Sequence, residues 1–523
     1  MLQKNQEKSG TSALGLCFVL ALVVAVAALV RYLQYEAYVD YFMRTYGSNL
    51  DLDRVAESYH RWVIDILTAQ RGGFYSDFAP QSNQAIYWLP FYNFVSVMGM
   101  FVTGNWSLTT CRMVSAVTGI ITAGIVALTA RRLYNNLWHS VIAGLVAGTL
   151  PWYVDYSLWG VPHALAAFLI AIAVYAFVTE RPMLFGIAGA LAVATSYEAW
   201  VVVLAVALLA SKYRGWVGRK AWQATGPAVA VVVLWSLWSV ANVGNPFGWV
   251  LRYLATIGWR PVFDLGDAGL YMFQLLVPTF FFGLVAVAWG IYKGQVTRIL
   301  ALAIVAFVAI ATLFHVLTLD RGSPARLLII YPMISALVPP VFPTFRGSLP
   351  RKTVLLGLLL IWLLLPQYAL LDQEKGPLTG KAYIVAPEYR TAKALNEFYQ
   401  EGMIISDSPI VMYYSGLSPT LFFSSREIGW YRDDPDNSKL AEWLKARDVV
   451  VIVWENSTSS ELREILPSLS DGETHQLGRV RLTPVYEDTL AERYQIRQEG
   501  GTTLWEHDYP GTPDLIVYEL QVA

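Results

Sequence analysis

Carboxylates, an imidazole and aromatic rings gather between two long apolar runs near the N-terminus, the first ending at Val30 and the second opening at Met113. The segment between them carries Asp51, Asp53, Glu57, Tyr59 and His60, followed by Tyr87-Trp88-Leu89-Pro90. A carboxylate can take a proton from a hydroxyl group, an imidazole can move a proton or bind a metal, and aromatic rings settle at a membrane surface. Such groups beside a bilayer suggest chemistry on a lipid-borne substrate.

Further ionisable residues lie at the ends of later apolar runs. They are Asp155, His163, Glu198, Arg321 and Arg326. The topology predicted below places all of them on the outer side of the membrane, as it does the first loop. An ionisable side chain near hydrocarbon costs about 2.5 to 3.5 kcal/mol on insertion scales, so a group of them implies a polar cavity. The arginines would bind a phosphate there.

Each of these residues also has a plainer interpretation. Acids and histidines at the ends of spans can simply be solvated at the interface. Asp51 and Asp53 can be the cap and the first-turn acid of a helix over residues 55–68, where they interact well with the helix dipole. Arg321 can be a lipid-headgroup anchor.

The composition is that of a polytopic membrane protein. Of 523 residues, 55% are hydrophobic and only 15% are charged, the mean hydropathy is +0.43, and apolar tracts recur up to about residue 371. A net charge of -1 gives no basic field for nucleic acid, and we expect no nucleic-acid partner. With Cys17 and Cys111 as the only cysteines, a disulfide framework and a cysteine-bound zinc site are both excluded.

The basic residues set the predicted topology, because short cytoplasmic loops collect Lys and Arg. With the N-terminal run as an uncleaved anchor, we predict about 11 membrane helices. They lie near residues 13–32, 113–130, 140–156, 162–179, 183–196, 199–211, 222–243, 269–291, 299–318, 327–344 and 353–371. Counting residues 87–103 as a further span would place the later basic clusters outside, so we predict an interfacial helix there, in the first outer loop. A single span over residues 183–211 would likewise place the later basic residues outside, so we predict two spans with a break at Tyr197–Glu198.

The odd number of crossings places the C-terminal tail outside the cell. We therefore predict a transmembrane domain over residues 1–375 and a soluble extracytoplasmic α/β domain over residues 376–523. Helices over 388–400 and 438–447 alternate there with strand-like segments at 403–406, 421–424 and 449–453.

The order of several motifs resembles that of the GT-C superfamily of polyprenyl-phosphate-sugar-dependent membrane glycosyltransferases, such as protein mannosyltransferases and aminoarabinose transferases. The resemblance covers roughly residues 10–345, and the motifs are Glu57-Ser-Tyr59-His60, Trp88-Leu89-Pro90, Arg112-Met-Val-Ser115-Ala-Val-Thr-Gly119, Arg131-Arg132-Leu-Tyr, Pro151-Trp152-Tyr-Val-Asp155-Tyr-Ser, Thr195-Ser-Tyr197-Glu198-Ala-Trp200 and Arg326-Leu-Leu-Ile-Ile-Tyr-Pro332.

The chain also departs from that family in four places. Ala56 stands beside Glu57 where relatives often have paired acids, which leaves Glu57, Asp53 and Asp51 as alternatives for the catalytic acid. Pro162-His163 replaces Thr-Glu, and Ser196 replaces an arginine before Tyr-Glu. The Trp-Trp-Asp signature of oligosaccharyltransferases is absent, which argues against en bloc transfer of a large glycan to asparagine.

The resemblance implies an inverting transfer of a sugar from a dolichyl or undecaprenyl phosphate donor to a hydroxyl of a protein, glycan or lipid acceptor. It implies a multi-pass protein of the plasma membrane with an extracytoplasmic active site. It assigns catalysis to Glu57, Asp53 and Asp155, donor phosphate binding to Arg321 and Arg326, and substrate binding to Tyr59, His60, Trp88, Tyr197 and Glu198. It also allows a divalent metal, Mg²⁺ or Mn²⁺, held by His60, Asp155 and His163.

Two other classes of protein remain as alternatives. A membrane transporter or lipid flippase would spread polar residues through the depth of the bilayer or show inverted repeats. An anchored sensor or adhesion protein would not need acids and arginines at the outer ends of several spans.

Overall fold

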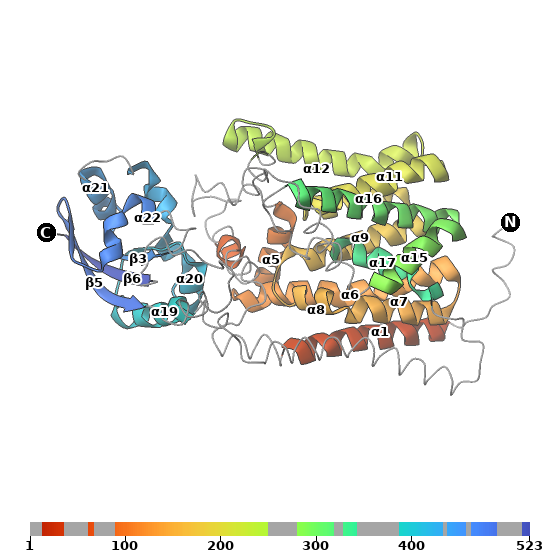
Figure 1. Ribbon diagram of the computed structural model, residues 1–523, viewed down its shortest axis with the longest axis horizontal. Coiled ribbons are helices and arrows are strands. Elements are labelled where there is room, and N and C mark those ends of the chain that lie inside the picture. Colours follow the sequence, from red (N-terminus) through yellow and green to blue (C-terminus); the bar gives the residue numbers. More distant parts are fainter. Residues whose placement is uncertain are drawn as a thin grey trace. The chain divides into compact units, whose positions relative to one another are not determined.

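The structure is a computed structural model that describes residues 13–35, 61–66, 89–248, 251, 280–317, 328–341, 386–431, 437–456, 462–488 and 515–522. The chain divides into two compact units (Figure 1). The first comprises Met1–Glu36, Tyr87–Thr103 and Thr109–Leu371, and the second comprises Ala37–Ile86, Gly104–Leu108 and Asp372–Ala523. The domain boundary predicted between residues 375 and 376 lies outside the described residues and stays a prediction.

The first unit is helical, and its long helices run lengthwise beside one another (Figure 1). Its helices are α1 (Ala13–Gln34), α5 (Pro90–Thr103), α6 (Leu108–Tyr134), α7 (Leu137–Thr149), α8 (Pro151–Tyr156), α9 (Pro162–Val178), α10 (Pro182–Val193), α11 (Glu198–Arg214), α12 (Arg219–Val243), α15 (Phe280–Lys293), α16 (Gln295–Leu317) and α17 (Tyr331–Leu337), with a 3-10 turn, η4, at Pro339–Val341.

Four helices among the described residues are long and apolar enough to cross a membrane. They are Leu14–Gln34, Leu108–Tyr134, Arg219–Ala241 and Gln295–Leu313, and shorter apolar helices span Leu137–Thr149, Pro162–Val178, Pro182–Val193 and Leu328–Leu337. The prediction of a multi-pass helical membrane protein is therefore confirmed. The total of about 11 crossings stays a prediction, because the span predicted at 353–371 lies outside the described residues.

Proline and glycine fix where several helices begin and end. Pro151, Pro162 and Pro182 each stand in the first turn of α8, α9 and α10, where the missing N–H costs nothing. Gly215 closes α11 in the left-handed region at φ 65°. These residues mark boundaries between successive helices.

Two predicted spans can be compared directly with the helices. The span predicted at 140–156 is wrong as a single helix, because Leu150 is extended ahead of Pro151 and the chain divides there into α7 and α8. The break predicted near Tyr197–Glu198 is confirmed, since α10 ends at Val193 and α11 begins at Glu198. The interfacial position predicted for residues 87–103 stays a prediction, although helix α5 forms there.

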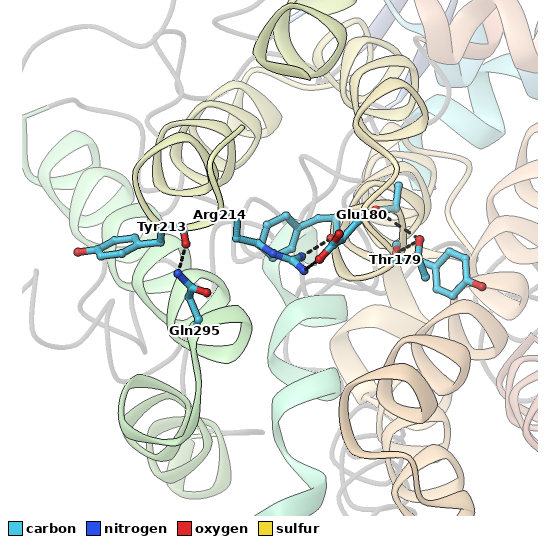
Figure 2. A network of polar contacts seen from close by, with 8 residues as sticks. Thr179, Glu180, Tyr213, Arg214 and Gln295 are labelled. Atoms are coloured by element: carbon cyan, nitrogen blue, oxygen red, sulfur yellow. Dashed lines mark hydrogen bonds and ion pairs between the residues drawn. The ribbon is translucent and has the colours of Figure 1, made fainter. Parts of the chain in front are cut away.

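Polar contacts join three helices of the first unit (Figure 2). Arg214, in the last turn of α11, forms an ion pair with Glu180 and donates to the Phe177 carbonyl oxygen at 2.8 Å. Gln295, the first residue of α16, donates to the carbonyl oxygen of Tyr213. These contacts tie the end of α9 to α11 and α16.

The second unit contains one mixed sheet, in the order β2-β1-β3-β6-β5-β4. Strand β1 is parallel to β2 and β3, and the other pairs are antiparallel. The strands are β1 (Met403–Ile405), β2 (Phe422–Phe423), β3 (Val449–Glu455), β4 (His475–Leu477), β5 (Val480–Asp488) and β6 (Leu515–Val522), and the helical segments are α19 (Ala386–Phe398), α20 (Pro409–Ser415), η6 (Pro419–Leu421), η7 (Ser425–Tyr431), α21 (Ser438–Ala446), α22 (Leu462–Ile465) and η8 (Pro467–Asp471).

Helices cover both faces of this sheet (Figure 1). On one face, Leu440 and Leu444 of α21 pack with Trp454 of β3 in a buried apolar core. On the other face α19 lies against β5 and β6, where Arg390 forms a bidentate ion pair with Asp488 at 2.6 and 2.8 Å. The predicted α/β character of this region is confirmed, whereas the sequence did not indicate β4, β5 and β6.

Candidate active site

The turn between α8 and α9 packs closely on the start of α6. Gly160 lies in this turn at φ 71°, and a side chain there would approach the backbone nitrogen of Arg112 and the Cβ of Cys111 to 3.2 Å. Glycine is thus required both for the backbone conformation and for the close approach. The contact brings Asp155, at the end of α8, near Arg112, in the second turn of α6.

One indole contacts both of these charged residues. Trp159 donates from Nε1 to the Oδ1 atom of Asp155 at 3.0 Å, and the Arg112 guanidinium lies over the same ring, 5.9 Å from its centroid. Asp155 is only 9% exposed and Arg112 only 4%. The structure therefore holds a carboxylate and a guanidinium, both largely withdrawn from water, on a single aromatic side chain.

Arg31 fixes the backbone that carries Asp155. Its Nε donates to the hydroxyl of Ser157 at 2.8 Å, and its Nη1 donates to the carbonyl oxygens of Gly148 at 2.9 Å and Ala27 at 3.1 Å. The guanidinium also lies over the Tyr153 ring, 5.5 Å from its centroid. One buried cation thus joins the last turns of α1 and α7 to the residue that ends α8.

Helix α5 contacts α6 and the turn between α10 and α11. The Tyr92 hydroxyl is 3.2 Å from Ser115 Oγ, which donates to the Val161 carbonyl oxygen at 3.1 Å. At the start of the same helix, the Phe91 N–H donates to the Ala194 carbonyl oxygen at 3.0 Å. Helix α5 is therefore bonded directly to the 194–197 turn, and through Ser115 of α6 to the 157–161 turn.

Of the predicted site residues, four are described. Asp155 contacts Trp159, and the His163 ring lies edge-on to Tyr156, 5.7 Å between ring centroids. Glu198 accepts a hydrogen bond from Ser196, and Tyr197 packs beside Trp200 at 6.2 Å. The other predicted residues lie outside the described part of the chain, and they are Asp51, Asp53, Glu57, Tyr59, His60, Trp88, Arg321 and Arg326.

The predicted metal ligands are only partly described, because His60 falls outside the described residues. Among the residues that are described, no group of three or more His, Cys, Asp or Glu side chains is placed to hold a metal ion. Asp155 and His163 each contact an aromatic neighbour instead. Metal binding by these three residues stays a prediction.

Three residues of this region were not nominated for a role from the sequence. Arg112 enters the sequence analysis only as part of a motif, and the sequence predicts no role for Arg31 or Trp159. The i,i+4 spacing of Asp155 and Trp159 was an available signal, since side chains four apart meet on a helical turn. Nothing local to Arg31 indicates its contact with Ser157, 126 positions away.

Comparisons with known proteins connect this architecture to membrane enzymes. No family model matches the chain, and no curated protein sequence matches it. Among solved structures, ArnT from Cupriavidus metallidurans bound to undecaprenyl phosphate is similar with a TM-score of 0.56, 12% identity, and coverage of 88% of this chain and 96% of that one. The archaeal oligosaccharyltransferase AglB from Archaeoglobus fulgidus, in complex with an inhibitory peptide and a dolichol-phosphate, has a TM-score of 0.53 and 11% identity, over 96% of this chain and 88% of its own. The chain has a GT-C-like fold.

Proposed function

We propose that this protein is an inverting glycosyltransferase that moves a sugar from a polyprenyl phosphate donor to an acceptor hydroxyl at the outer face of the membrane. The observation that carries the proposal is the buried contact of Asp155 and Arg112 with Trp159. A second support is the fold, which is shared with proteins solved with undecaprenyl phosphate and dolichol-phosphate. The acceptor would be a protein, a glycan or a lipid.

The proposed reaction is a single displacement at the anomeric carbon. A carboxylate takes the proton of the acceptor hydroxyl, the hydroxyl oxygen bonds to the anomeric carbon, and the bond from that carbon to the phosphate oxygen breaks. Polyprenyl phosphate leaves with both electrons of that bond. Glu57 is the proposed base, with Asp53 and Asp51 as alternatives, and such assistance contributes about 10² to 10⁴ in rate.

The leaving phosphate gains negative charge and needs cations beside it. Arg321 and Arg326 are the proposed phosphate ligands. We add Arg112, whose guanidinium is held in place by the Trp159 ring. A planar guanidinium suits phosphate because two N–H groups can bond two oxygens at once.

Asp155 is proposed to contact the acceptor or a divalent cation. With His60 and His163 it offers one carboxylate and two imidazoles, a ligand set that suits Mn²⁺ better than Mg²⁺, which prefers oxygen. When bound, such a cation would polarise the phosphoryl oxygens. Tyr59, His60, Trp88, Tyr197 and Glu198 are the proposed substrate contacts.

A transfer assay tests the proposal. Purified full-length protein is given a panel of radiolabelled polyprenyl-phosphate sugars, with membrane extract as the source of acceptor. We expect transfer of one labelled sugar and release of polyprenyl phosphate. No transfer from any donor of the panel would remove the proposed function.

Two variants assign the roles. Glu57→Gln is expected to abolish transfer while donor binding is retained, and wild-type turnover by this variant would refute the base. Arg326→Ala is expected to weaken donor binding, and an unchanged affinity for polyprenyl phosphate would remove that role. Asp471→Asn, on the surface of the second unit, serves as the control for loss of a carboxylate elsewhere.

A further inference from the structure

A helical segment of the first loop belongs to the second compact unit. Residues 61–66 are helical and lie in the part of the chain, Ala37–Ile86, that groups with Asp372–Ala523. All six side chains are buried, including the charged Arg61 and Asp65. This described part of the helix is therefore enclosed by other parts of the protein.

Trp62 joins this segment to two other parts of the second unit. Its Nε1 donates to the Trp106 carbonyl oxygen at 2.9 Å. The indole and the Tyr413 ring form a T-shaped pair with 5.1 Å between ring centroids, a favoured geometry for aromatic pairs. Only 7% of Trp62 is exposed. The first loop is thus joined to a helix of the C-terminal sheet domain.

The helix that carries Tyr413 is itself firmly attached to the sheet. Helix α20 follows β1 after a turn in which the Asp407 carboxylate accepts hydrogen bonds from the Ser424 hydroxyl at 2.9 Å, the Ser425 backbone N–H at 2.8 Å and the Ser425 hydroxyl. Ser408 caps the helix by accepting from the Val411 N–H at 3.3 Å. Tyr413 is therefore a fixed point against which the first loop packs.

We propose that Trp62 and Tyr413 are positioning residues, through which the C-terminal domain places the acid-bearing segment of the first loop for catalysis. This inference rests on the proposed function, because it takes Glu57 as the base. Glu57 is four positions before Arg61, so the chain keeps their Cα atoms within about 14 Å of each other. Fixing residues 61–66 accordingly restricts where Glu57 can lie, and misplacement of a reacting group by about 1 Å can cost 10²-fold in rate.

Hydrogen exchange tests the contact without any assay of activity. In the purified full-length protein, Tyr413→Ala is expected to speed exchange of the backbone amides of residues 61–66 at least about tenfold, because local opening becomes easier. Tyr413→Phe keeps the ring and should exchange as the wild type does. The matched control is Tyr399→Ala, since the Tyr399 hydroxyl bonds only the nearby Gly402 carbonyl oxygen in the described structure. Unchanged exchange in Tyr413→Ala would overturn the proposal.

Kinetics then test the catalytic part. Tyr413→Ala is expected to lower kcat about 10- to 100-fold while the affinity for polyprenyl phosphate stays within about twofold. Trp62→Phe, which keeps the ring and loses the N–H, should lower kcat less, and Tyr413→Phe should restore it. A wild-type kcat in Tyr413→Ala, or an equal loss in Tyr399→Ala, would refute the positioning role. If the wild type transfers no sugar, the proposed function fails, whereas the exchange comparison still decides whether the contact orders the loop.

Discussion

The two ends of helix α9 hold charged residues in opposite ways. At the Glu180 end, Arg214 and Glu180 form a direct ion pair, and Glu180 is 65% exposed. At the His163 end, about 25 Å away along a helix of 17 residues, Asp155 and Arg112 are buried and share the Trp159 indole. An exposed ion pair contributes little to the free energy of unfolding. Burying a charged group, in contrast, costs free energy. The difference supports the proposal that the His163 end takes part in catalysis, whereas the Glu180 end is structural.

Among the variants that leave the proposed catalytic carboxylates in place, the largest effect is expected from Trp159→Leu. This change removes both the N–H that bonds Asp155 and the ring beneath Arg112, so the two charged groups lose their common support. We expect turnover to fall about 100-fold. The comparison variant is Trp216→Phe, because Trp216 packs between Phe177 and Phe185 at the Glu180 end. Equal turnover in the two variants would erase the distinction between the ends of α9.

Arg31→Lys is expected to destabilise the protein by about 2 kcal/mol. Lysine keeps the buried charge, but its single ammonium group cannot replace the planar guanidinium, which donates to Ser157 and to Gly148 from two different nitrogens. The measurement is thermal unfolding of the purified protein. Wild-type stability would show that the guanidinium does not hold α8 in place.

Gly119→Ala tests how tightly the His163 end is packed. A methyl group at this position would approach Arg31 Nη2 to 2.9 Å and Ser157 Cβ to 3.0 Å, and such overpacking costs about 1 to 3 kcal/mol. Gly124, on the same helix, is the matched control, because its nearest neighbour would be Val24 Cγ2 at 3.5 Å. Gly124→Ala should leave the unfolding temperature unchanged or raise it. A similar loss of stability in both variants would contradict the packing around Arg31.

The smallest effect is expected from Glu180→Gln. Because the Glu180 carboxylate is mostly exposed, loss of its ion pair with Arg214 should cost less than about 1 kcal/mol in unfolding free energy. The Arg214 bond to the Phe177 carbonyl oxygen remains. Thermal unfolding measures the change, and a loss of several kcal/mol would mean that this end also depends on a critical charge.

Much of the fold could be predicted from local signals. The lengths of the apolar runs indicated the helices, and proline and glycine marked their ends. One predicted span, 140–156, is divided at Pro151 into α7 and α8. In the second unit, strand β3 and helix α21 were predicted closely. Strand β6 was missed because it pairs with β3 and β5, which lie far away in the sequence.

The site was predictable only in part. Asp155 stood out because an acid at the end of an apolar run is unusual, and it is indeed buried beside a cation-binding indole. The roles of Arg31 and of Trp62 depend on contacts that join distant segments, and no local pattern encodes such contacts. The sequence therefore indicates which groups are costly near a membrane, while the tertiary structure decides which of them meet.

The most direct measurement compares sugar transfer by Asp155→Asn and Glu180→Gln, purified alongside the wild type and assayed with the same polyprenyl-phosphate donor. Each variant replaces a carboxylate by its neutral amide at one end of α9. We predict that Asp155→Asn lowers turnover at least about 10²-fold, because the acceptor or a cation is then misplaced, whereas Glu180→Gln stays within about twofold of the wild type. Wild-type turnover by Asp155→Asn would contradict the assignment of catalysis to the His163 end.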